Sequence, residues 1–235
     1  MTIIDQYIKP HRSNDIRASR NGKKPAIAIC LGAFAALLVF SASRAQTVTD
    51  SSADMTAQPS STATCFACHG ALGAGSIAGM PRLAGQNPDY LAHALSMFKE
   101  RTRASDVMQG VAQSLSDSDM HALALYFSKQ HPPRAQGASA PDPNLVAAGK
   151  QLAEMGAGPE VAACFSCHAT AGKGNGARFP SIAGQPETFL VNRLHDFQAR
   201  AKKAPPAQGS MTAVSATLNN TQILQAAAYL STIEP

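Results

Sequence analysis

The chain has 235 residues, of which 45% are hydrophobic and 15% charged, and it contains no tryptophan. Residues 1–45 hold seven of the 20 basic residues and two of the 15 acidic residues, which leaves 13 of each in the rest of the chain. That balance argues against a nucleic-acid partner. The alanine-rich composition, with scattered leucine, favours helices over strands.

Residues 1–45 are predicted to be a secretory signal peptide. A basic segment is followed by an apolar run over 26–40 and by a small-residue site that predicts cleavage after Ala45, which implies export to the periplasm. The alternative is a retained membrane anchor, but the run is shorter than the roughly 20 apolar residues that a spanning helix needs. Cys30 falls within this segment, so four cysteines remain after cleavage.

The rest of the chain is predicted to contain two copies of one unit. A lead rich in Ser, Thr and Ala (46–62) precedes domain 1 (63–131), a Pro/Ala-rich linker (132–143) and domain 2 (144–235). The segment that begins at Cys65 recurs at Cys164 with an offset of 99, and an insertion near residues 202–208 later raises the offset to 103. Two copies indicate a tandem duplication, since a solenoid needs more repeats.

Helix-start signals recur along both copies. An Asn-Pro pair at 87–88 and a capping box at Ser116 and Asp119 predict two helices of the first copy. Asn144 is predicted to cap a helix over 145–155, and Asn219 with Asn220 to begin one over 223–233. Strand-like alternation is absent from the sequence, so the predicted fold class is all-α.

Each copy carries a C-x-x-C-H motif, formed by Cys65, Cys68 and His69 and by Cys164, Cys167 and His168. The two thiols of such a motif can bond one edge of a haem, and the histidine can offer an imidazole nitrogen to the iron. The motif thus predicts two covalently bound haem c groups.

Three other uses of the cysteines fit the sequence less well. A redox dithiol usually lies in a βαβ context, which this sequence lacks. A single zinc site would need cysteine pairs much closer together than 99 residues. Two disulfides would leave both histidines unexplained.

The sixth iron ligand is predicted from the repeat. Among the candidate histidines and methionines outside the motifs, only Met108 and Met211 occupy matching positions, each seven residues before a leucine. Methionine is a usual second axial ligand in electron carriers. We expect both to lie in loops over the haem face, and the alternative is that they fill the core.

With these motifs, the chain resembles class I c-type cytochromes, and specifically the two-haem cytochrome c4 family, over roughly residues 60–235. The stretches MPRLAGQ and FPSIAGQ, which contain Pro81 and Pro180, add to the likeness. The resemblance implies two mostly helical domains, each with a few helices around one haem. It also implies that the carbonyl groups of Pro81 and Pro180 hold the two ligand imidazoles through their ring N–H groups.

One feature departs from that family. The second copy has a glycine-led helix before its motif, which the family packs against its closing helix, here bearing Tyr229. The first copy has Ser-Ser-Thr-Ala-Thr over 60–64 instead. One hypothesis is that domain 2 or a partner covers the exposed side of the helix bearing Tyr126.

The expected function is transfer of single electrons, because two six-coordinate haems leave no vacant position for a substrate and predict a protein that is not an enzyme. The resemblance implies a quinol-oxidising complex as donor and a terminal oxidase as acceptor, and peripheral membrane association stays open. Two alternatives remain: a cytochrome c subunit of a periplasmic dehydrogenase complex, and a haem enzyme with one open iron site. A gas-binding or redox-sensing module is disfavoured, since no signalling domain accompanies the motifs.

Overall fold

A computed structural model describes residues 58–76, 78–135 and 140–235, all of which belong to one compact unit, Asp50–Pro235. The predicted signal peptide and most of the lead lie outside the described residues. Within them the fold is helical, as predicted, and the β-structure consists of isolated bridges such as Ala157 to Val161. None of the helices described there is long and apolar enough to span a membrane.

The first half runs from α1 to α4. Its helices are α1 (Thr62–His69), α2 (Pro88–Lys99), α3 (Asp106–Gln113) and α4 (Asp117–Ser128), with a short 3-10 turn, η2 (Ala71–Gly73), after α1. The predicted starts of two of them are confirmed. Asn87 accepts a hydrogen bond from Tyr90 N at the start of α2, and Ser116 and Asp119 form a complete capping box on α4.

The second half runs from α5 to α9. Its helices are α5 (Pro143–Met155), α6 (Phe165–His168), α7 (Glu187–Ala201), α8 (Met211–Thr217) and α9 (Asn220–Thr232), with η3 (Thr170–Gly172) after α6. Asn219 caps α9 and forms a capping box with Gln222, as the sequence predicted for that start. The predicted cap at Asn144 is wrong. Asp142 is the cap, because its side chain accepts from Asn144 N, and Pro143 occupies the first turn.

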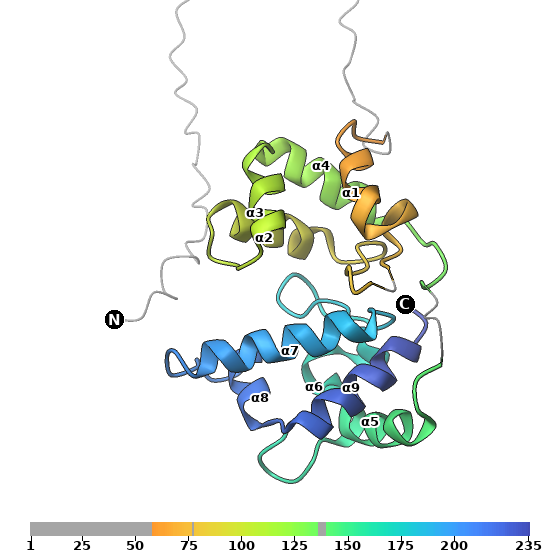
Figure 1. Cartoon of the computed structure of the whole chain (residues 1–235), viewed down its shortest axis with the longest axis vertical. Helices are drawn as coiled ribbons and strands as arrows, with labels where there is room; N and C mark the ends of the chain where they lie inside the picture. The colour runs from red at the N-terminus through yellow and green to blue at the C-terminus, as the bar shows by residue number, and fades with distance from the viewer. Residues whose placement is uncertain (1–57, 77, 136–139) are drawn as a thin grey trace, which may run out of the picture. The chain divides into compact units, whose positions relative to one another are not determined.

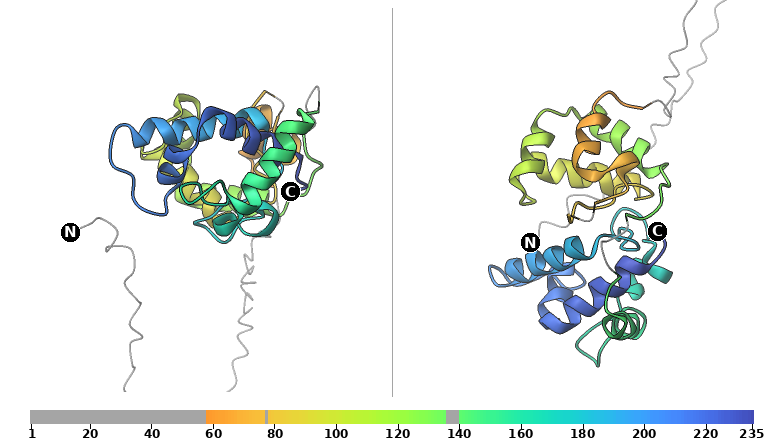
Figure 2. Two further views of the ribbon diagram at one scale, coloured as in Figure 1. Left: turned by 90° about the horizontal axis from the view of Figure 1, so that it is seen from below. Right: turned by 45° about the vertical axis from the view of Figure 1, so that its right-hand side comes forward.

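Helices α5 and α9 cross in close contact (Figures 1 and 2), as the family resemblance implied. Gly149 lies at the crossing, where a Cβ atom would come within 1.9 Å of the Gln225 carbonyl oxygen. Only glycine lets the two backbones approach this closely. This contact holds in place the helix that precedes the second C-x-x-C-H motif in the chain.

The first half closes without an equivalent of α5 among its described residues. Tyr126 on α4 is only 6% exposed, and its ring lies against Phe66 and Phe127 of the same half, with centroid distances of 6.3 and 5.3 Å. Rings of its own half therefore surround Tyr126, and cover of the exposed side of α4 by the second half or a partner stays a hypothesis. Ala122, which the repeat aligns with Gln225, is exposed.

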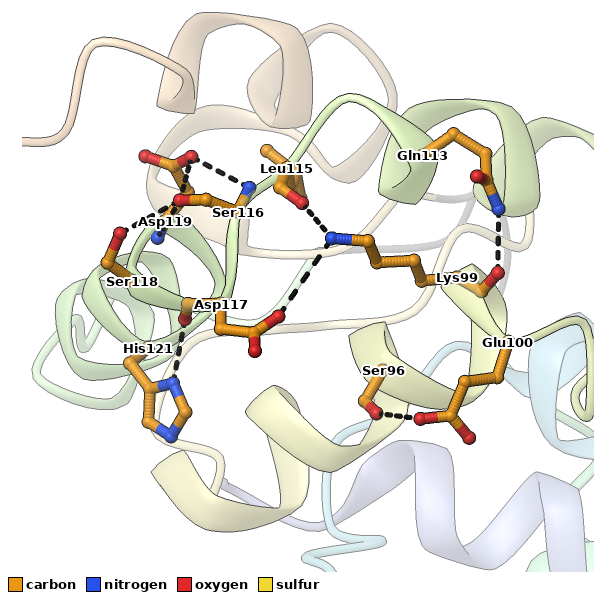
Figure 3. Close-up of polar contacts among 10 residues, drawn as sticks. All are labelled: Ser96, Lys99, Glu100, Gln113, Leu115, Ser116, Asp117, Ser118, Asp119 and His121. Atoms are coloured by element: carbon orange, nitrogen blue, oxygen red, sulfur yellow. Dashed lines mark hydrogen bonds and ion pairs between the residues drawn. The ribbon is translucent and has the colours of Figure 1, made fainter.

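A set of polar contacts fixes α3 between α2 and α4 (Figure 3). The Lys99 ammonium donates to the Leu115 carbonyl, and the Gln113 side chain donates to the Lys99 carbonyl at 2.6 Å. In the second half Gln198, at the position matching Lys99, donates to the Leu218 carbonyl at 2.8 Å. In each half, a side chain near the end of the long helix (α2 or α7) therefore donates to the backbone carbonyl of the leucine just before the last helix (α4 or α9).

Candidate functional site

The cysteines of each motif lie on or beside one short helix. Cys65 and Cys68 are on α1, Cys167 is on α6, and Cys164 is the N-cap of α6. Residues three apart on a helix share a face, so each pair can present both sulfurs to one side. All four cysteines are free thiols in the structure, and burial raises the pKa of Cys65 and of Cys164, the latter to about 11. The disulfide alternative has no support in this geometry.

The two motif histidines end α1 and α6 and are buried, with 7% of His69 and 5% of His168 exposed. His69 Nδ1 lies 2.8 Å from the Pro81 carbonyl oxygen, and His168 Nδ1 lies 2.7 Å from that of Pro180. A carbonyl oxygen can only accept, so Nδ1 carries the proton and Nε2 carries the lone pair. Burial lowers the pKa of both imidazoles, with the carbonyl opposing it, which favours the neutral form that binds a metal.

Two glycines that the sequence reasoning missed hold the proline segments in place. Gly75 N donates to the His69 carbonyl, and Gly174 N donates to the His168 carbonyl, both at 2.8 Å. Both have positive φ, and a Cβ at Gly174 would lie 2.6 Å from Ser181 N. The backbone after each histidine therefore turns back so closely that its proline carbonyl faces the imidazole. Their spacing of 99 was the signal that could have found them.

The two repeated methionines lie in the first turns of helices. Met108 is in the first turn of α3, where its N–H donates to the Ser105 side chain at 3.3 Å, and Met211 is the first residue of α8. The expectation that both lie in loops is wrong, because Ser105 and Ser210 cap helices α3 and α8, which therefore include the two methionines. Both methionines are half-buried. Ligation of iron by either sulfur stays a prediction.

Three arginines with little exposed surface were also missed by the sequence reasoning: Arg82 and Arg103 are buried, and the Arg193 side chain is 16% exposed. The Arg82 guanidinium donates to the carbonyl groups of Ala84, Pro132 and Pro133, which ties the start of the linker to the first half. The other two are Arg103, stacked on Phe98, and Arg193, stacked on Phe197.

Burial, together with the nearby positive charge of Arg103, lowers the pKa of Arg193 to about 10, so the Arg193 guanidinium remains charged at neutral pH. Asp196 Oδ2 lies 3.8 Å from Arg193 Nη1. Two cations near each other, one buried and one mostly covered, favour a further anionic group beside them.

The donor set fits covalently attached haem better than a metal ion alone. The part of the chain that the structure describes holds no cluster of three or more His, Cys, Asp or Glu side chains able to bind a metal ion. Instead, each half offers two free thiols and one neutral imidazole on the same short segment. Thiols at this spacing suit thioether bonds to a haem edge, and the imidazole Nε2 suits its iron.

Comparison with known proteins agrees with this chemistry. The family model for cytochrome c matches residues 57–130 and 146–234. A thiosulfate dehydrogenase electron acceptor of Thiomonas intermedia is 36% identical over 183 residues, covering 76% of this chain and 82% of that protein.

Two solved structures are also similar. Cytochrome c4 of Acidithiobacillus ferrooxidans has a TM-score of 0.63 and 30% identity, covering 73% of this chain and 99% of that one. Thiosulfate dehydrogenase of Marichromatium purpuratum has a TM-score of 0.64 and 37% identity over 72% of this chain, which spans only 36% of that longer chain.

The family match extends over both halves and includes both C-x-x-C-H motifs. Each motif binds one haem, and the likeness to a two-haem cytochrome covers both halves as well. The chain therefore belongs to the cytochrome c family, as an electron-transfer protein of the cytochrome c4 kind with two covalently bound haem c groups.

Proposed function

We propose that this protein is a periplasmic carrier of single electrons with no catalytic activity of its own. His69 and Met108 would hold one haem iron, and His168 and Met211 the other. The observation that carries the proposal is the matched pair of buried, neutral imidazoles whose Nδ1–H groups donate to Pro81 and Pro180. Haem iron at each site supplies one-electron chemistry at a potential set by its ligands and their hydrogen bonds.

The protein's own groups would set the conditions for that chemistry. A backbone carbonyl fixes the orientation of each imidazole and keeps its Nε2 deprotonated. Arg103 and Arg193 would supply positive charge to the carboxylates of the haem groups, which burial would otherwise disfavour. Neither role needs a proton to move when the iron changes oxidation state, which suits rapid electron transfer.

The proposed donors are of two kinds. The first is a quinol-oxidising membrane complex that passes electrons through this protein to a terminal oxidase. The second is a periplasmic dehydrogenase, with this chain as its electron acceptor or cytochrome subunit. The second is favoured by the likeness to a thiosulfate dehydrogenase electron acceptor and by the structural match to part of a thiosulfate dehydrogenase.

Optical and magnetic spectra of the purified, oxidised protein test the carrier proposal. We expect two low-spin haems with the weak methionine–iron charge-transfer band, both slow to bind added imidazole or cyanide. Met108→Ala and Met211→Ala should each turn one haem into a fast ligand-binding site and leave the other unchanged. A high-spin haem in the unaltered protein would overturn the proposal and favour a haem enzyme with one open iron.

The donor is tested by kinetics of reduction. The oxidised protein is mixed in separate experiments with a thiosulfate dehydrogenase plus thiosulfate, and with membranes that oxidise quinol. Rapid reduction in the first mixture alone would identify a dehydrogenase partner. Rapid reduction in the second alone would identify the respiratory route.

A further inference from the structure

Two glutamines bind the backbone of the opposite half in a crossed arrangement. The side chain of Gln185 accepts from Arg82 N at 2.9 Å and donates to Arg82 O at 3.0 Å. The side chain of Gln86 accepts from Ser181 N at 2.8 Å and donates to Ser181 O at 2.9 Å. The repeat pairs Gln86 with Gln185 and Arg82 with Ser181, so one interaction is made twice.

The amide groups that these glutamines bind are those that hold the haem histidines. The N–H of Arg82 belongs to the same peptide group as the Pro81 carbonyl, which accepts from His69 Nδ1. The N–H of Ser181 belongs to the same peptide group as the Pro180 carbonyl, which accepts from His168 Nδ1. Each peptide group therefore accepts from its own histidine on one side and donates to the other half's glutamine on the other.

Both glutamines are buried, with 4% of Gln86 and 5% of Gln185 exposed. Hydrogen bonds in such surroundings are strong, and bonds in a chain polarise one another. Each chain of hydrogen bonds here runs from the imidazole of one half, through a peptide group, to the glutamine side-chain amide of the other half.

We propose that Gln185 tunes the haem of the first half and Gln86 tunes the haem of the second half, each acting across the contact between halves. Both are positioning residues, and this inference rests on the proposed ligation by His69 and His168. A peptide whose N–H donates to a glutamine has a more negative carbonyl oxygen, which accepts more strongly from the imidazole. The imidazole then becomes a stronger donor to iron and favours the ferric state. Each glutamine therefore lowers the potential of the haem in the opposite half.

The sequence makes the two effects unequal. Gln86 Oε1 also accepts from Asn87 N at 3.1 Å, so it is shared between two donors. At the matching position after Gln185 stands Pro186, which has no N–H to donate. Polarisation by Gln185 should therefore exceed that by Gln86.

The test is a redox titration that resolves the two haems by their NMR signals, on full-length protein with both haems attached. In Gln185→Leu we expect the potential of the first-half haem to rise and that of the second-half haem to stay. In Gln86→Leu we expect the potential of the second-half haem to rise, by a smaller amount, and that of the first-half haem to stay. The two variants break the same contact between halves, so each is the matched control of the other.

The sign and the crossing separate this proposal from simple loosening of the contact. A cavity of about 390 Å³ adjoins both glutamines, and water entering from it would stabilise the ferric charge and lower the potential. Equal shifts in both haems, a shift confined to the glutamine's own half, a fall in potential or no shift would each overturn the proposal.

A second substitution covers the case in which a leucine variant does not fold. Gln185→Glu keeps an acceptor for Arg82 N and makes it anionic, so the first-half haem should fall in potential, and by more than the second-half haem. Equal falls in the two haem potentials would mean that the added negative charge acts on both haems alike, which would contradict the proposal. If both haems are low-spin and carry electrons but neither variant shifts its crossed haem, tuning fails while the carrier function stands. An open iron in the unaltered protein would instead defeat the carrier function itself.

Discussion

The two halves present the same histidine geometry inside different outer shells. Both halves share one ring pair, Phe66 with Tyr126 and Phe165 with Tyr229. In the second half α5 also packs on α9 at Gly149, whereas the first half adds the ring of Phe127 instead. At the position that matches Phe127 the second half has Leu230. Despite this difference, the Nδ1 to carbonyl distances are 2.8 and 2.7 Å. The segment from each motif to its proline is therefore specified by its own local sequence. The additional helix α5 contributes more to stability than to the geometry of the histidine site.

The crossing of α5 with α9 gives the largest expected difference between the halves. Gly149→Ala should cost about 3 kcal/mol, because its Cβ would overlap the Gln225 carbonyl and α5 would have to move away. Native-state hydrogen exchange should show faster exchange along α9 and unchanged exchange along α4. Gly110→Ala on α3 is the matched control, because nothing lies within 4 Å of its Cβ position. Equal loss of protection in α4 would mean that the halves unfold as one unit.

Loss of the contact between the long helix and the last helix should also lower the free energy of unfolding by different amounts in the two halves. Gln198 donates to the carbonyl groups of Ser215 and Leu218, and Gln198→Leu should cost about 2 kcal/mol. Lys99→Leu should cost about 1 kcal/mol, because 34% of the lysine side chain is exposed and water can replace its bond to Leu115. Urea unfolding of each variant measures both losses. A larger loss for Lys99→Leu would contradict this ranking.

The capping boxes of α4 and α9 should be closely matched. Ser116→Ala and Asn219→Ala each remove a side-chain acceptor for the third helical N–H and should each cost about 1 kcal/mol. Amide exchange in the first turn of each helix reports the loss directly. Exposed Gln151→Ala on α5 provides a surface control. A clear inequality between the two helices would show that tertiary contacts, rather than the box, hold one of the starts.

The smallest expected difference is a dependence on pH that only α4 shows. Hydrogen bonds from the Ser116 side chain and backbone lower the pKa of Asp119, whereas α9 has the uncharged Gln222 at that position. Because the folded pKa lies below the unfolded value of about 3.9, the contribution is complete above that pH and is lost as pH falls through the folded value. NMR of the Ser116 and Asn219 amides should therefore show fraying on acidification at α4 alone. Asp119→Asn should abolish the difference.

Much of this molecule is determined by local sequence. The caps at Asn87, Ser116 and Asn219 predicted helix starts correctly, because a capping side chain satisfies backbone N–H groups only two or three residues away. The C-x-x-C-H motifs and their repeat predicted two haem sites, because all three groups of each motif lie within five consecutive residues.

Tertiary structure alone decided the rest. Gln86 and Gln185 stand in a visible repeat, but no local pattern states that each binds the other half's proline–histidine segment. Arg103 and Arg193 look like ordinary charged residues in the sequence, and only folding buries the first and covers most of the second. The reason is range: capping and covalent attachment act within one turn of helix, whereas burial and hydrogen bonds between halves depend on residues about 100 positions apart.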